Sequence, residues 1–137
     1  MFKKFAFLMA LAVFGFCFYS LYAVKTPVFA AYADEYELYL TAGSFGNGIV
    51  YADAKSFAAY KSVKGESCTV TVSYEQVLKD FNATHLFSEK CDAGENFYAY
   101  SAKLPYRVYV NGVAVNIHYF KGESANKVGT PIIFGSY

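Results

Sequence analysis

Apolar and polar residues alternate in several short stretches of the chain, which is the pattern of half-buried β-strands. The clearest stretch covers Glu35–Leu40, and a glycine-rich turn then leads to a short strand over Ile49–Tyr51, so a hairpin is predicted. β-Branched residues predict another strand over Glu66–Val72. Two further strands are expected over Thr84–Glu89 and Asn96–Ala102.

One segment instead has the period of an α-helix. Its apolar stripe consists of Tyr74, Val77, Leu78 and Phe81. Ser73 lies directly before the stripe and forms a capping-box pattern with Gln76. A helix beginning after Ser73 is therefore predicted, and Asn82 can end it in the left-handed conformation.

The last part of the chain predicts a second hairpin. Asn111 and Gly112 form a favoured two-residue turn between Tyr106–Val110 and Val113–Phe120. Pairing outward from this turn matches Val110 with Val113, Val108 with Val115 and Tyr106 with Ile117. The apolar tail Pro131–Phe134 is expected to dock as an edge strand or against the core. Together the elements favour an α+β fold, mainly an antiparallel sheet with one or two helices packed on one face, preceded by an N-terminal hydrophobic helix.

The N-terminal 33 residues have the pattern of an export signal. Lys3 and Lys4 precede the uncharged apolar run Phe5–Val24, and an A-x-A triplet ends at Ala33. Cleavage after Ala33 is predicted, although the run is long enough to remain as a membrane anchor of about 30 Å. In both cases the lysines stay cytoplasmic, and residues 34–137 form a single small domain that is secreted or held outside the membrane.

Removing the leader changes the charge balance of the protein. The whole chain has 12 basic and 11 acidic residues, and three of the basic ones, Lys3, Lys4 and Lys25, lie in the leader. A slightly acidic domain without a basic run is not expected to bind nucleic acid. The chain has no phosphate-binding or dinucleotide-binding glycine pattern, so no cofactor is expected.

Two cysteines and two histidines are the residues best suited to chemistry in the exported part. Cys68 and Cys91 form an even pair, which makes them a disulfide candidate in an oxidising exterior. With His85 and His118 they make a Cys₂His₂ set, but its spacing is too wide for a typical zinc site, so no metal site is predicted. The same residues support one functional hypothesis, a small hydrolase that uses Cys91 or a carboxylate with His85 or His118.

Two other groups of residues are binding candidates. Tyr109, His118 and Phe120 fall on the outer face of the last predicted hairpin, where they form an aromatic platform unless a helix or the tail covers them. The sequence Lys-Gly-Glu-Ser begins at Lys64 and again at Lys121, which indicates either a shared turn chemistry or paired loops that bind an anion.

The leading hypothesis is therefore a non-enzymatic binding module of the cell envelope or extracellular space, whose partner is an envelope protein or a glycan. If the leader is not cut, the chain also contacts the membrane through its N-terminal segment. A third hypothesis is a structural factor whose edge strand pairs with copies of itself.

Overall fold

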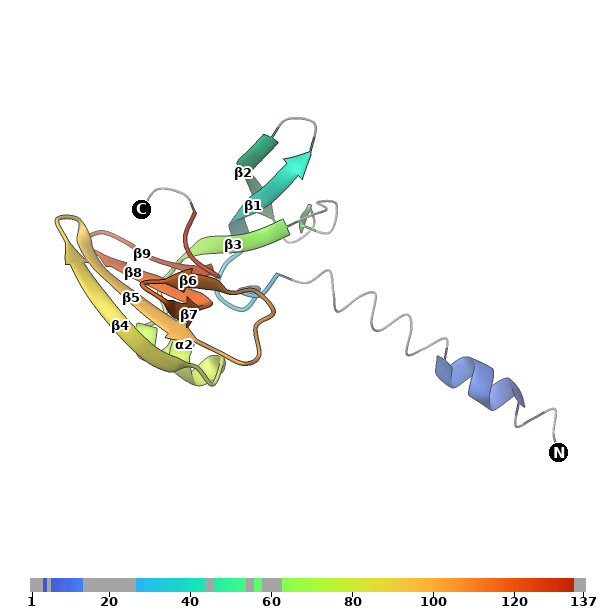
Figure 1. Ribbon diagram of the computed structural model, residues 1–137. Coiled ribbons are helices and arrows are strands. Elements are labelled where there is room, and N and C mark those ends of the chain that lie inside the picture. Colours follow the sequence, from blue (N-terminus) through green and yellow to red (C-terminus); the bar gives the residue numbers. More distant parts are fainter. Residues whose placement is uncertain are drawn as a thin grey trace.

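The structure is a computed structural model that describes residues 4, 6–13, 27–43, 46–53, 56–57 and 63–134. Within these residues, seven strands form one antiparallel sheet in the order β2-β1-β3-β9-β8-β5-β4 (Figure 1). The strands are β1 (Glu35–Gly43), β2 (Gly46–Asp53), β3 (Val63–Val70), β4 (Thr84–Cys91), β5 (Gly94–Tyr100), β8 (Ile117–Gly122) and β9 (Asn126–Thr130). The predicted class, a mainly antiparallel α+β fold, is confirmed.

The first predicted hairpin is present. β1 pairs with β2, and the alternation along β1 buries Tyr36 and Leu38 while the neighbouring residues lie toward the surface. β2 begins at Gly46, three residues before the predicted start. Asp53 ends this strand and accepts a hydrogen bond from the backbone N–H of Ser56 at 2.7 Å, as an N-terminal cap does.

The predicted helix is α2 (Tyr74–Asp80), which lies below the β4–β5 hairpin in Figure 1. The hydroxyl of Ser73 accepts from the backbone N–H of Gln76 at 3.2 Å, so the predicted N-cap is correct. The side chain of Gln76 donates to Asp80 instead of returning to Ser73, so only half of the capping box forms. Asn82 follows the helix with φ 49°, the left-handed conformation that was predicted.

The second hairpin is shorter than predicted. β6 (Val108–Val110) and β7 (Val113–Val115) pair in the predicted register and form a separate two-stranded ribbon. The predicted pairing of Tyr106 with Ile117 is wrong, because the chain leaves the ribbon at Asn116 and Ile117 begins β8 beside β5. At this point the buried side-chain amide of Asn116 forms the hydrogen bonds that a neighbouring strand would otherwise form with Ser101. It accepts from the backbone N–H of Ser101 and donates to the Ser101 carbonyl, both at 2.7 Å.

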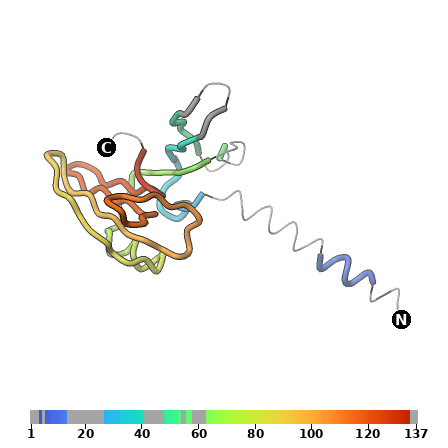
Figure 2. The backbone as a smooth tube through the Cα atoms, in the orientation of Figure 1, coloured from blue at the N-terminus to red at the C-terminus, as the bar shows by residue number. Residues whose placement is uncertain are grey.

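The apolar tail docks on the sheet, as predicted. Residues 131–134 follow β9 and leave the sheet beside β3 (Figure 2). They contact His118, whereas α2 packs on its strand neighbour Tyr119, so the tail and α2 lie on opposite faces. Phe134 stacks on Tyr39 of β1 with ring centroids 4.1 Å apart. Gly65 makes room for this stack, because a Cβ there would lie 2.6 Å from the Phe134 ring. Ile133 is buried against Gly129 of β9, where a Cβ would lie 2.9 Å from the Ile133 side chain.

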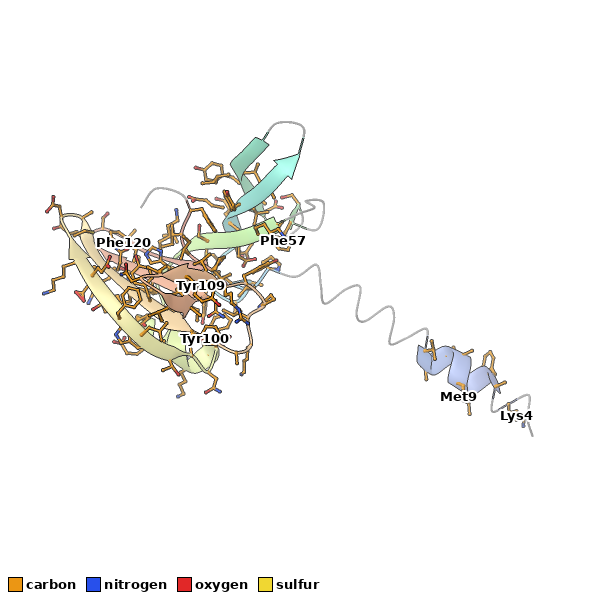
Figure 3. All side chains as sticks on the ribbon, viewed as in Figure 1. Lys4, Met9, Phe57, Tyr100, Tyr109 and Phe120 are labelled. Carbon is orange, nitrogen blue, oxygen red and sulfur yellow. The ribbon has the colours of Figure 1, made fainter. Side chains whose placement is uncertain are left out.

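Little of the predicted N-terminal helix is described. Residues 6–13 are helical, and their apolar side chains are exposed, including Phe7 and also Met9, which Figure 3 labels. The remainder of the predicted run Phe5–Val24 lies outside the described residues. No helix among the described residues is both long enough and apolar enough to cross a membrane.

Candidate functional site

A pocket of about 360 Å³ opens where two adjacent strands of the sheet separate. The ladder between β1 and β3 ends at the pair Glu37–Ser67, although β3 continues to Val70 and β1 begins at Glu35. We call the resulting opening the β1–β3 pocket. It is lined by Ala33, Asp34, Glu35, Tyr36, Glu37, Tyr51, Ser67, Cys68 and Thr69.

Negative charge predominates in the β1–β3 pocket. Asp34, Glu35 and Glu37 contribute three carboxylates, and Glu37 forms an ion pair with Lys127, whose Nζ lies 2.7 Å from Glu37 Oε2. Lys127 belongs to β9, which is separated from β1 by β3, and its mostly buried side chain neutralises Glu37 from that side. The carboxylates of Asp34 and Glu35 are the excess negative charge that an incoming cation would meet.

One wall of the pocket is aromatic. Strand pairing places Tyr51 of β2, Glu37 of β1 and Ser67 of β3 side by side in one row on the sheet face. The Tyr51 side chain is 78% exposed, although Tyr is an amphipathic residue whose ring usually packs against neighbours. An exposed ring beside carboxylates is an arrangement that favours cationic groups, because the ring face and the carboxylates both attract positive charge.

The thiol at the floor of the pocket is not reactive. Cys68 is 2% exposed, and burial, followed by the nearby charge of Glu66, raises the pKa of its thiol to about 12. A thiol with this pKa remains protonated at neutral pH and is a poor nucleophile. Cys68 therefore acts as a small apolar core residue beneath the pocket.

His118 is buried and neutral. Its Nδ1 accepts from the backbone N–H of Ile133 at 3.1 Å, so the ring proton is on Nε2, which donates to Asn96 Oδ1 at 2.7 Å. Burial lowers the pKa of His118 to about 4. The other end of the Asn96 amide contacts Cys91 Sγ at 3.8 Å. Asn96 therefore lies between His118 and Cys91, whereas a nucleophile needs direct contact with its base.

The second histidine lies on the other side of the sheet. His85 Nδ1 is 2.7 Å from the hydroxyl of Tyr74, which belongs to α2 on the face opposite His118. The histidines and Cys91 that the hydrolase hypothesis used are thus not brought together. The described residues also contain no group of three or more side chains placed to hold a metal ion.

The structure does not bring the three residues of the aromatic platform together on one exposed face. Tyr109 is 69% exposed on the β6–β7 ribbon, whereas His118 and Phe120 are buried in β8 of the main sheet. Figure 3 labels Tyr109 and Phe120 on these two separate elements. His118 stacks on Tyr98 with ring centroids 4.6 Å apart, and the docked tail covers it. These side chains form a second core layer, because a small domain needs its large aromatic residues inside.

The two lysines of the repeated sequence are not in paired loops. Lys64 lies within β3, and Lys121 lies near the end of β8. Lys121 pairs with Asn126, which in turn pairs with Val70. Val70 is therefore the β3 residue that lies level with Lys121. Lys64 is six positions before Val70 on β3, which is roughly 20 Å along the strand. The shared-turn interpretation also fails for the first copy, which is in a strand.

The predicted disulfide is absent, and both cysteines are free thiols. Cys68 is in β3 and Cys91 is at the end of β4, with β9, β8 and β5 between them. Four strand spacings amount to roughly 19 Å, whereas bridged cysteines have Cα atoms within about 7 Å. The distance in the sheet, which spacing along the sequence does not reveal, prevents the bond.

No protein-family model matches this chain, and neither the curated proteins nor the solved structures include a match. The β1–β3 pocket therefore provides the basis for a functional assignment. Sequence reasoning missed it, although the alternation Glu35, Glu37 correctly marked the polar face of β1. The separation of β1 from β3 creates the pocket, and this separation leaves no local sequence signal.

Proposed function

We propose that this protein is a non-enzymatic binding module, exported to the cell envelope or beyond, that binds a cationic group of a protein partner in the β1–β3 pocket. The observation that carries the proposal is the combination of three carboxylates, opposed by one lysine, with the exposed ring of Tyr51. The pocket volume of about 360 Å³ also lies within the usual range for binding sites, roughly 300–1,000 Å³.

The residues suggest how such a group is held. An arginine or lysine side chain entering the pocket pairs with the carboxylates of Asp34 and Glu35, because Glu37 is already paired. A guanidinium is planar and weakly hydrated, so it also stacks on the ring of Tyr51. Arginine is therefore the better of the two ligands.

The partner backbone has a binding position as well. Beyond Ser67, β3 pairs with β9 on one side and has no β1 partner on the other. An extended segment that lies along residues 68–70 would add hydrogen bonds on the side that has no β1 partner, as in β-strand addition. This feature favours a peptide over a glycan, which has no regular row of amide groups.

Titration of the purified full chain with a fluorescent tetra-arginine peptide tests the proposal. Tetra-glutamate and a tetramer of N-acetylglucosamine serve as the anionic and glycan probes. We expect binding of tetra-arginine alone, with an affinity that falls as salt is added, because exposed ion pairs are screened. Binding of the glycan without the cationic peptide would contradict the proposed ligand class.

Matched variants locate the binding site. Tyr51→Ala and the double variant Asp34→Asn with Glu35→Gln should each weaken tetra-arginine binding by about tenfold. Tyr109→Ala and Glu89→Gln change side chains that are also exposed but lie elsewhere, and they should leave the affinity unchanged. Equal losses in both sets would mean that the peptide binds by overall charge and not in the pocket.

The self-association hypothesis retains one supporting observation. Ile49 and Tyr51 are exposed on β2, which is an edge strand of the sheet, and apolar edges can pair with other copies. Light scattering during size exclusion at high concentration tests this alternative. A monomer would reject it, and an Ile49→Lys variant that separates a dimer would support it.

A further inference from the structure

Residues 27–33, which the predicted cut would remove, are part of the folded core. Pro27 and Phe29 are buried, and the ring of Phe29 is 0% exposed. Two successive turns shape the segment: Ala30 N–H donates to the Pro27 carbonyl at 3.3 Å, and Tyr32 N–H donates to the Phe29 carbonyl at 2.9 Å. An ordinary leader has no such packing, because it is discarded.

A buried acid is matched to this segment. Glu66 of β3 is 3% exposed, and its Oε1 accepts from the backbone N–H of Phe29 at 2.9 Å. Burial raises the pKa of Glu66, while the hydrogen bonds from the N–H groups of Phe29 and Val28 act in the opposite direction. Without the segment, this carboxyl group loses the donors that compensate its burial.

Aromatic contacts join the segment to the helix end. Phe29 packs edge-to-face on Phe81 with ring centroids 5.7 Å apart, and Tyr32 does the same at 6.1 Å. The Tyr32 hydroxyl donates to Asp80 Oδ2 at 2.6 Å. On the other side, the Tyr36 hydroxyl donates to the carbonyl of Ala33. The segment is thus fixed to α2, β3 and β1 by interactions of different kinds.

We infer that residues 27–33 remain in the mature protein, so that the leader is either cut before Pro27 or kept as an anchor. The A-x-A triplet that ends at Ala33 is then a structural feature and not the processing site. The inference rests on the packing of the segment alone and is independent of the ligand proposed for the pocket.

The direct test is the N-terminus of the exported protein. The full chain, with a C-terminal tag, is exported from a bacterial host and examined by intact mass and N-terminal sequencing. An uncut chain, or an N-terminus at Pro27 or earlier, supports the inference. A mature N-terminus at any position from Val28 to Asp34 overturns it.

Two substitutions in the full chain test the packing. Phe29→Ala should lower the thermal midpoint by more than about 10 °C, because it empties a buried aromatic site. Ala30→Ser is the matched control, since Ala30 is the exposed neighbour, and it should leave the midpoint unchanged. Equal midpoints for the two variants would overturn the inference.

A third substitution reports docking without depending on folding yield. The hydrogen bond from Tyr32 is the largest of the effects that lower the pKa of Asp80. Tyr32→Phe should therefore raise the Asp80 pKa, measured from its carboxyl carbon chemical shift. An Asp80 pKa that does not change would show that the segment is not docked in solution, which contradicts the inference.

Discussion

The buried histidine should make the protein sensitive to acid. In the folded chain His118 is neutral, with its pKa lowered to about 4 by burial, while an unfolded histidine titrates near 6.5. Between these values the unfolded chain binds a proton that the folded chain does not. Stability therefore rises with pH from 4 to 6.5, is complete above 6.5, and is lost as the pH falls through this window.

The size of this stability change follows from the pKa shift of His118. A difference of about 2.5 pKa units corresponds to about 3 kcal/mol, which is a large part of the 5–15 kcal/mol that holds a typical domain folded. The geometry explains the direction: the second proton would have to bind Nδ1, which already accepts the N–H of Ile133. Protonation of Nδ1 would place its N–H directly against the N–H of Ile133, beneath the docked tail, so that two donors face each other.

Urea unfolding at several pH values between 4 and 7.5 measures the effect. His118→Gln removes the titrating ring and should flatten the dependence of the free energy of unfolding on pH. The difference in this free energy between wild type and variant should therefore change by about 3 kcal/mol between pH 4 and 6.5. Glu66 has a raised pKa and so acts in the opposite sense, but it is present in both proteins and cancels.

Parallel pH profiles for wild type and His118→Gln would refute this reasoning. They would mean that His118 is protonated in the folded chain, and hence that the tail does not cover it. A flat profile caused by loss of the fold is recognised independently, because the variant would then show no cooperative transition at pH 7.5.

Three shorter predictions follow from local geometry. Gly65→Ala should cost about 1–3 kcal/mol, because the new Cβ would lie 2.6 Å from a tail ring, whereas Gly48→Ala meets nothing within 4 Å and should be neutral in the same urea assay. Asn116→Ala should cost about 2–4 kcal/mol in urea unfolding, since a buried backbone N–H and C=O lose their partner. Alkylation without reductant, followed by mass spectrometry, should label exposed Cys91 in the native protein and buried Cys68 only after unfolding.

Much of the fold could be predicted because local patterns coincide with tertiary contacts. The stripe of α2 faces the core, Ser73 caps the helix, and the Asn111–Gly112 turn adopts positive φ values of 51° and 79°. In each case the signal and the structure involve neighbouring residues. The chain-order pattern of strands was also sufficient to predict an antiparallel sheet.

The central strand β9 was missed because its burial depends on distant partners. Asn126–Thr130 has one large apolar residue, Val128, so no alternation is visible. Lys127 is nevertheless 8% exposed, and it is compensated by Glu37, ninety positions away in the sequence. Such a pair becomes visible only when both strands are placed in one sheet.

The same limitation explains why the candidate site was missed from the sequence, and why the packing of residues 27–33 leaves no local signal. A leader and a core segment can share the composition of residues 27–33, and only the acceptor Glu66 distinguishes them. Ala33 and Asp34 then connect this segment to the β1–β3 pocket, whose wall they form. A cut after Ala33 would place a new positive charge, the amino group of Asp34, at the site where a cation is proposed to bind. The retention that we infer from the packing of residues 27–33 would also keep this positive charge away from the pocket.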